Sequence, residues 1–302
     1  MSDGPGDDMI TTIDTLVLRD GRALELFTAG QRDGTPVVFH HGTPFAAVPY
    51  PAAAHSVAAR GARLVYWSRP GYAGSTTQPG RRVAHAAADA ADVLDALGHD
   101  RFVTIGWSGG GPHALACAAL LPDRCEAAAI IAGVAPFDAE GLDFLDGMGP
   151  ENIEEFGLAA AGGQPFADFL ARESAQLATL SGPDMADALG GLVSDVDKAA
   201  LTGPFADFMA RALVAAGSAG PAGWHDDDMA FLGDWGFDLG GIRCPVAIWQ
   251  GDQDRMVPYA HGVWLASHVP GVRPHLVAGE GHVSLGVGAF DHILDDLLAS
   301  RN

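Results

Sequence analysis

The sequence predicts an α/β protein in which helices cover both faces of a mostly parallel sheet and a helical region is inserted. Eight short apolar runs, each closed by Gly, Pro or a polar turn, have the pattern of buried strands. Stretches rich in Ala and Leu, which favour helices, lie between several of these runs. The alternation stops between about residues 136 and 238 and then resumes. Because alternating strands and helices indicate a parallel sheet, the interruption indicates an insertion.

The first two runs predict an antiparallel hairpin. "TIDTLVL" (12–18) and "LELFTAG" (24–30) alternate or cluster apolar residues, and the turn-forming "RDGR" separates them.

Six further runs predict the remaining strands, at 36–42, 62–71, 101–108, 126–133, 244–252 and 273–279. Helices are predicted at 83–97 and 111–122 from their Ala and Leu content. The stretch 288–301 predicts a helix with one apolar face that packs on the sheet, formed by Phe290, Ile293, Leu294, Leu297 and Leu298.

Between residues 136 and 238 the chain consists of helix-like segments separated by glycines. Two of them, "PFADFLAR" (165–172) and "PFADFMAR" (204–211), are nearly identical and begin with proline at a favoured first-turn position. Their flanks do not match, which indicates similar local packing rather than a repeat. We therefore divide the chain into a core at 1–135, a helical cap at 136–238 and a second core part at 239–302.

Composition excludes several classes of function. Hydrophobic residues make up 48% of the 302 residues and charged residues only 18%, so a disordered chain is not expected. The formal net charge of −21 repels phosphate backbones and anionic lipid surfaces. A small molecule, rather than nucleic acid or a membrane, is the expected partner, and the oligomeric state stays open.

The N-terminal stretch and the cysteines predict a soluble cytoplasmic protein. The first residues are acidic and lack the basic and apolar segments of a signal peptide, and no apolar run is long enough to cross a membrane. Cys117, Cys125 and Cys244 form no CxxC pair, so neither a disulfide framework nor a zinc site is indicated. No metal or other cofactor is expected.

The stretch "GWSGG" (106–110) matches G-x-S-x-G between a predicted strand and a predicted helix. A plain strand-to-helix turn would also explain it. A nucleophilic Ser108, however, needs a base and a carboxylate that orients the base. "GDQDRMVP" (251–258) and "GEGHVSL" (279–285) each follow a predicted strand and supply these groups in the order Ser, Asp, His.

With these motifs the sequence resembles the α/β-hydrolase superfamily over nearly its whole length. The resemblance is carried by "HHGTP", "SRPGYAGS", "GWSGGGP", "GDQDRMVP" and "GEGH", in the order typical of that superfamily. It implies an α/β-hydrolase fold with a catalytic triad of Ser108, Asp254 and His282. It also implies an oxyanion hole formed by the backbone N–H groups of Thr43 and Gly109.

Other residues compete for these roles. Asp252 is expected to serve the turn before Asp254, and Asp138 is the alternative acid after the preceding strand. Histidines 40, 41 and 113 are expected to be structural. Ser68 stands where the commoner family form has an acid, and it is expected to organise the loop beside the site.

The stretch "GWHDDDMAF" (223–231) gathers one histidine and three carboxylates. Adjacent residues point in different directions, so a metal site is not expected. Capping of a helix by Asp226 or Asp227 explains the run.

The resemblance also predicts the reaction. A serine at the elbow argues against the carboxylate-based chemistry of haloalkane dehalogenases and epoxide hydrolases, and the insertion contains no tyrosine. We expect hydrolysis of an ester or related acyl bond through an acyl-enzyme on Ser108. The aromatic-rich insertion indicates a small, largely apolar substrate. The candidate substrate-binding residues are Trp107, Phe45, Phe166, Phe205 and Trp224.

Three alternatives stay open. A proline iminopeptidase-like aminopeptidase would recognise an amine with cap carboxylates, for which Glu151, Glu154, Glu155 and Glu173 are available. A biosynthetic thioesterase, cyclase or lyase could use the same fold. A catalytically silent homologue would bind a ligand without turnover.

Overall fold

The computed structural model describes residues 12–301, and in this part of the chain eight strands form one sheet. All eight predicted strands are confirmed. They are β1 (Thr12–Val17), β2 (Ala23–Gly30), β3 (Thr35–His40), β4 (Ala62–Trp67), β5 (Phe102–Trp107), β6 (Cys125–Ile131), β7 (Val246–Gly251) and β8 (Arg273–Val277).

The order of strands in the sheet is β1-β2-β4-β3-β5-β6-β7-β8. The predicted hairpin is confirmed, because β1 and β2 pair antiparallel and Leu16 lies opposite Leu24. β2 is antiparallel to β4, and every pairing from β4 to β8 is parallel. The carboxyl ends of β3 to β8 therefore meet at one edge, where ligands bind in open α/β sheets.

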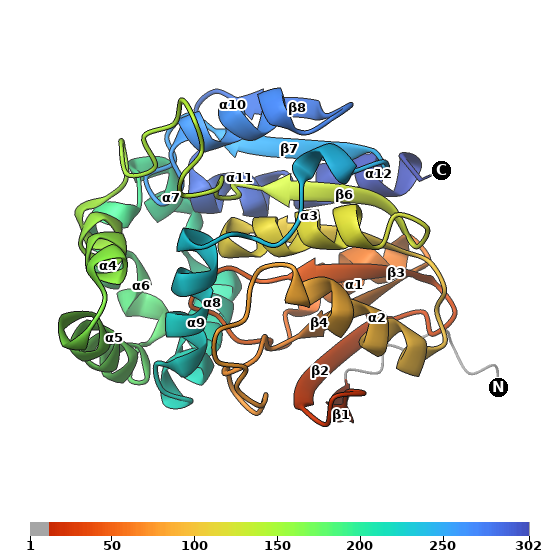
Figure 1. The fold of residues 1–302 in the computed structure, drawn as a ribbon, viewed down its shortest axis with the longest axis horizontal. Coiled ribbons are helices and arrows are strands. Elements are labelled where there is room, and N and C mark those ends of the chain that lie inside the picture. Colours follow the sequence, from red (N-terminus) through yellow and green to blue (C-terminus); the bar gives the residue numbers. More distant parts are fainter. Residues whose placement is uncertain (1–11, 302) are drawn as a thin grey trace.

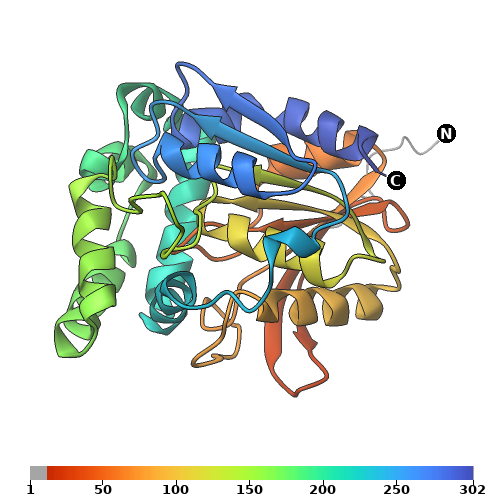
Figure 2. The ribbon, with the colours of Figure 1, turned by 45° about the horizontal axis from the view of Figure 1, so that its top comes forward.

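Helices cover both faces of the sheet, as predicted (Figures 1 and 2). Side chains alternate along each strand, so Val38 packs in one apolar cluster with α2 and α3, whereas Val37 packs in another with α1 and α12. The core helices are α1 (Pro51–Ala59), α2 (His85–Leu97), α3 (Gly111–Leu120), α10 (Tyr259–His268), α11 (His282–Gly288) and α12 (Phe290–Ala299), with 3₁₀ turns η1 (Ser108–Gly110) and η4 (Leu239–Gly241).

Between β6 and β7, a stretch that the structure describes throughout, the chain forms helices and turns without a strand. The helices lie at the edge of the sheet to which the arrowheads of the parallel strands point (Figures 1 and 2). They are α4 (Pro150–Ala161), α5 (Gln164–Leu177), α6 (Met185–Ala188), α7 (Asp195–Ala200), α8 (Gly203–Ser218) and α9 (Ala222–Leu232), with η2 (Gly182–Asp184) and η3 (Gly190–Leu192). The two nearly identical segments belong to α5 and α8, which pack against each other.

One local prediction is wrong. Helix α9 begins at Ala222, so Asp226 and Asp227 lie inside the helix and do not cap it. Both side chains are buried, together with that of Asp228. Ion pairs with Arg69 and Arg81 from a distant loop explain why Asp226 and Asp227 lie within a helix.

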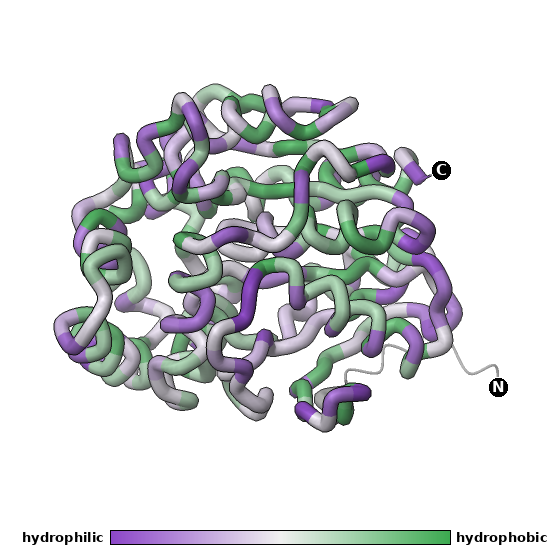
Figure 3. The backbone as a smooth tube through the Cα atoms, viewed as in Figure 1, coloured by the Kyte–Doolittle hydropathy of each residue, from purple (hydrophilic) through white to green (hydrophobic). Residues whose placement is uncertain are grey.

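Hydrophobic and hydrophilic residues occupy different parts of this fold. In Figure 3 the hydrophobic colour runs along the central strands, whereas hydrophilic segments gather in the outer loops and turns. Among residues 12–301, no helix is both long and apolar enough to cross a membrane.

Candidate active site

Ser108 lies in a strained turn at the carboxyl end of β5. Its φ is 57°, a conformation that non-glycine residues rarely adopt. A Cβ atom on Gly106 would collide with the carbonyl oxygen of Gly110, and a Cβ on Gly110 would collide with that of His40. The glycines of the motif therefore let the strand turn directly into α3 and expose the serine at the sheet edge.

The loop after β3 contacts this turn. A Cβ atom on Gly109 would lie 2.6 Å from Thr43 Oγ1, and one on Gly42 would lie 3.3 Å from Ser108 Cβ. Thr43 and Gly109, the two predicted oxyanion donors, are therefore neighbours beside Ser108. His113 is buried in α3, and its Nδ1 is bonded to the carbonyl oxygen of Gly109 at 2.8 Å.

Asp254 and His282 form a buried pair at the ends of β7 and β8. His282 Nδ1 lies 2.8 Å from Asp254 Oδ2. The other oxygen of Asp254 accepts the backbone N–H groups of Met256 and Val257, both at 2.9 Å, and the side-chain amide of Gln250 donates to Oδ2 at 3.1 Å. These bonds fix the carboxylate and direct Nε2 of the imidazole away from it.

The pKa of His282 is raised. Burial disfavours the charged imidazolium, but the charge of Asp254 and its hydrogen bond outweigh that effect, with a further contribution from Asp197. A histidine in this setting can accept a proton and hold the resulting charge.

Asp197 of α7 is a residue that the sequence did not single out. Its carboxylate accepts the backbone N–H groups of His282 (3.2 Å), Val283 (2.8 Å) and Ser284 (2.9 Å) and so satisfies the exposed donors at the start of α11. A Cβ atom on Gly281 would collide with this carboxylate, which explains the glycine before His282. A side chain of the insertion thus fixes the helix that carries the histidine.

The three motifs "HHGTP", "SRPG" and "HDDD" meet in an ionic cluster behind the Thr43 loop. The side chain of Asp227, fully buried in α9, is bonded to Arg69 and Arg81, each at 2.5 Å, and accepts the hydroxyls of Tyr72 (2.9 Å) and Thr43 (2.7 Å). Arg69 also donates to the carbonyl oxygens of His41 and Gly42. The loop that carries Thr43 is therefore held by charged groups from two distant segments.

Neighbouring side chains complete this loop structure. His41 Nε2 accepts the backbone N–H of Arg69 at 3.1 Å, and its Nδ1 is bonded to the carbonyl oxygen of Gly42 at 2.8 Å. The Ser68 hydroxyl accepts the N–H of Ala47 at 2.9 Å. His41 and Ser68 therefore hold together the loops that follow β3 and β4, which agrees with the structural roles expected from the sequence.

Replacing Asp227 by asparagine is expected to lower the free energy of unfolding by about 3 kcal/mol, because the buried Arg69 loses its counter-charge and the buried Arg81 loses the nearer of its two. The charges of Arg69 and Arg81 outweigh burial and hold the pKa of Asp227 well below its usual range. Its contribution to stability is therefore present above the ordinary aspartate pKa and is lost as the pH falls below it. Urea unfolding measures the change.

Asp234→Asn is the matched control, since Asp234 pairs with Arg82 at the surface. It should cost less than about 1 kcal/mol. Equal losses in the two variants would contradict a structural role for the Asp227 cluster.

Ser108 and His282 line the same cavity, which has a volume of about 180 Å³. Gly42, Thr43 and Gly109 form one side of it, and residues from α4, α5, α8 and α9 form the other. Most lining residues are apolar, with Phe156, Phe169 and Met209 among them.

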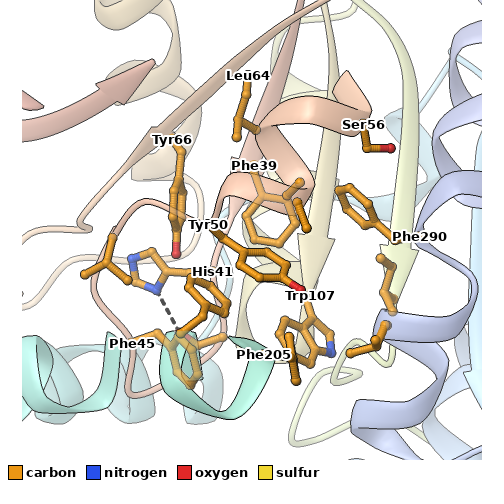
Figure 4. A pocket seen from close by; sticks show the side chains of 18 of the residues that line it. Phe39, His41, Phe45, Tyr50, Ser56, Leu64, Tyr66, Trp107, Phe205 and Phe290 are labelled. Carbon is orange, nitrogen blue, oxygen red and sulfur yellow. Dashed lines mark hydrogen bonds between the residues drawn. The ribbon is translucent and has the colours of Figure 1, made fainter. Parts of the chain in front are cut away.

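A second cavity of about 200 Å³ adjoins the first and is lined mainly by apolar side chains. Figure 4 shows the rings of Phe39, Tyr50 and Phe205 around it. Phe45 and Trp107 line both cavities and form part of the wall between them. The Trp107 indole also stacks on His282, with ring centroids 5.8 Å apart.

The candidate substrate-binding residues fall into three groups. Phe45, Trp107 and Trp224 line the cavity of Ser108. Phe205 lines only the second cavity. Phe166 lines neither of the two cavities, because it is buried in a cluster with Tyr72 and other apolar side chains. Helical periodicity identifies an apolar face but does not show which element that face contacts. The sequence therefore could not distinguish Phe166, which packs in the core of the insertion, from aromatic residues that line the cavity.

The alternative acids lie elsewhere. Asp252 accepts the backbone N–H of Gly279 at 2.8 Å and so ties the two loops together. Asp138 follows β6 in a turn and does not line the cavity of Ser108. Of the four glutamates considered for amine recognition, Glu151, Glu155 and Glu173 line that cavity, whereas Glu154 is exposed. Asp228 lines it as well and was missed, because the run of aspartates was interpreted as the start of a helix capped by Asp226 or Asp227.

A family model, curated proteins and solved structures all match this chain over most of its length. A family model described as alpha/beta hydrolase fold matches residues 35–289. A non-heme chloroperoxidase from Streptomyces lividans is 30% identical over 252 residues, which cover 82% of this chain and 84% of that protein. Among solved structures, a hydrolase from Pseudomonas aeruginosa PA01 has a TM-score of 0.67 at 19% identity, with 94% of this chain and 97% of that chain covered. The esterase EaEST from Exiguobacterium antarcticum has a TM-score of 0.67 at 18% identity, with 95% and 98% covered.

Proposed function

The chain belongs to the alpha/beta hydrolase fold family, and from this premise we propose that it is a serine hydrolase. Ser108 attacks the carbonyl carbon of an ester or related acyl bond, and His282 takes the hydroxyl proton and passes it to the leaving alcohol. Asp254 holds the imidazole, and the N–H groups of Thr43 and Gly109 stabilise the oxyanion. Water then releases the acid from the acyl-enzyme.

The observation that carries the proposal is the strained turn at Ser108, with φ 57°, in one cavity with a histidine bonded to a buried aspartate. Strain of this kind persists where it serves a site. The mostly apolar lining of the cavity supports a small, largely apolar substrate.

We further propose that residues 136–238 act as a lid over Ser108. Side chains from α4, α5, α8 and α9 form the wall of the cavity opposite the sheet, and Asp197 connects α7 to the helix of His282. A lid of this kind excludes water and selects the substrate.

Replacing Phe169 by alanine is expected to raise the ratio of kcat/KM for a hexanoyl ester over an acetyl ester about threefold or more, because a pocket discriminates by the methylenes it can hold. Phe169 lines the cavity, so its removal makes room for a longer chain. Initial rates with the two p-nitrophenyl esters measure the ratio.

Phe166→Ala is the matched control. It removes the same side chain from the same helix, but Phe166 does not line the cavity. The ratio should stay at the wild-type value. If both variants kept that value, α5 would not contribute to selectivity.

The hydrolase proposal is tested by labelling with a fluorophosphonate and by turnover of p-nitrophenyl butyrate. We expect one label per chain, mapped by peptide mass spectrometry to Ser108, and loss of turnover on labelling. An unlabelled protein that turns over no acyl ester would overturn the proposal and favour a silent ligand-binding homologue.

A peroxide-dependent halide oxidation is the second candidate, favoured by the name of the chloroperoxidase relative. The same preparation is assayed with hydrogen peroxide and bromide, using bromination of a dye as the readout. Bromination without ester hydrolysis would replace the first proposal by the second.

A further inference from the structure

The second cavity lies on the face of the sheet that α1 and α12 cover, outside the space between the sheet edge and the lid. Strand side chains form one wall, among them Phe39, Leu64 and Tyr66 (Figure 4). Phe39 is only half-buried, although β3 is a central strand. Protein interiors are close-packed, so an apolar space of about 200 Å³ indicates a binding site.

The cavity opens to solvent between α1 and the end of α11. Ala52 of α1 and Val287 and Gly288 of α11 line it and are exposed. The side chain of Val287 is 38% exposed, which places an apolar group at the opening. These three residues belong to the core, so a ligand can enter or leave here without passing the lid.

Two polar side chains deep in the lining are bonded to the protein itself. The ring nitrogens of His41 are bonded to the backbone of Gly42 and Arg69, as described above. Burial and the charge of Arg69 lower the pKa of His41 well below its ordinary value, so the ring is neutral. The hydroxyl of Tyr66 donates to the carbonyl oxygen of Ala46 at 3.3 Å.

The other polar side chains of the lining leave little for a ligand to bond. The Ser56 hydroxyl donates to Asp291, which is also paired with Arg60 at 3.0 Å. Tyr50 stacks on Phe208 with ring centroids 4.6 Å apart and adds one hydroxyl to the lining. Because a polar group that is buried without a partner is unfavourable, the cavity suits a hydrocarbon group and not a charged one.

One end of the cavity lies beside the reacting atoms. Gly42, Phe45 and Trp107 line both cavities. A Cβ atom on Gly42 would lie 3.7 Å from Ser108 Oγ. The indole of Trp107, which stacks on His282, also donates its N–H to the carbonyl oxygen of His282 at 3.3 Å. The wall between the cavities therefore contacts both the serine and the histidine.

The proposed reaction indicates which half of an ester faces this wall. The bond between the acyl carbon and the alcohol oxygen breaks, and that oxygen takes the proton from His282. The alcohol half therefore lies on the His282 side of Ser108, whereas the carbonyl oxygen lies at the N–H groups of Thr43 and Gly109. The second cavity is on the His282 side too, because α11, which begins with this histidine, continues into its wall.

We propose that the second cavity binds the hydrocarbon group of the alcohol half of the ester, and that the released alcohol leaves through the opening at Val287. This inference rests on the proposed hydrolase function and identifies the substrate as an ester of an apolar alcohol. The group reaches the cavity past Phe45 and Trp107, whose side chains act as a gate. Since an apolar cavity of about 150 Å³ holds benzene, the volume suits a ring or chain of about six carbons.

The test measures alcohol preference and acyl preference separately. The alcohol ratio is kcat/KM for hexyl butyrate over methyl butyrate, from butyrate release, and the acyl ratio is kcat/KM for p-nitrophenyl hexanoate over the acetate. We expect the wild-type protein to prefer the hexyl ester. Ala53→Phe places a ring in the second cavity from α1. It should lower the alcohol ratio about 10-fold or more and leave the acyl ratio within about twofold, because a pocket discriminates by the methylenes it can hold.

Two further variants guard the interpretation. Ala59→Phe makes the same change in the same helix at an exposed position outside the cavity, so both ratios should keep the wild-type values. Val287→Trp narrows the opening from an exposed position. It should lower the alcohol ratio in the same direction, and it carries the test if Ala53→Phe does not fold.

A binding experiment separates this inference from the hydrolase proposal. Titration calorimetry of Ser108→Ala protein with 1-hexanol should show binding that an added Ala53→Phe change weakens and an added Ala59→Phe change does not.

Three outcomes would be decisive. Hydrolysis of both butyrates with an alcohol ratio that neither Ala53→Phe nor Val287→Trp changes would overturn the alcohol site alone. A fall in the acyl ratio in place of the alcohol ratio would overturn the assignment of the cavity to the alcohol half. Hexanol binding that Ala53→Phe weakens, without turnover of any ester, would overturn the hydrolase proposal alone.

Discussion

Replacing Ser108 by alanine is expected to lower kcat/KM for p-nitrophenyl butyrate by about 10³-fold or more, because no other group can form the acyl-enzyme. The change removes one hydroxyl from a turn whose geometry is set by the neighbouring glycines, so the fold should persist. Steady-state rates measure the loss, and circular dichroism confirms folding.

Ser174→Ala is the control for this variant. Ser174 is a buried serine of α5 outside the cavity of Ser108, so the same chemical change there should leave the rate within about twofold. A Ser108→Ala protein that kept half of its activity would exclude Ser108 as the nucleophile, whatever its position in the cavity.

Replacing Asp254 by asparagine is expected to lower kcat about 10³- to 10⁴-fold, because the amide stabilises the wrong tautomer of the histidine and cannot compensate its charge. The geometry should survive, since Asn can still accept the N–H groups of Met256 and Val257. Rates with one ester at saturating concentration measure the effect.

The pH profile supplies a second readout of this variant. His282 acts as a base only when it is neutral, and its raised pKa places the acid limb of kcat/KM above the usual histidine value. Asp254→Asn removes the charge that raises this pKa, so the acid limb of the residual activity should move to lower pH. An unmoved limb would indicate that another group titrates.

Asp252→Asn is the matched change two residues away. Asp252 accepts a loop N–H and is exposed, so its replacement should cost less than about 10-fold. If Asp252→Asn proved the more damaging variant, or only Asp138→Asn reduced activity, the acid of the triad would be misassigned.

The sequence by itself determined the order of the strands along the chain, the hairpin and the family resemblance. These depend on local patterns, such as the apolar run that becomes β7 or the glycines at 106 and 110 that permit the turn at Ser108. The location of the insertion between two strands could likewise be predicted, because strand-like periodicity disappears there.

Only the tertiary structure decided which side chains of the insertion meet the cavity. Phe166 and Phe169 have the same periodicity, yet only Phe169 lines the cavity. Asp227 and Asp228 are adjacent in sequence, but one is bonded to Arg69 and Arg81 while the other lines the cavity of Ser108. Asp197 bonds to the helix of His282 across 85 residues of sequence. The role of each of these side chains depends on partners that are distant in the sequence, and a local sequence pattern cannot predict such partners.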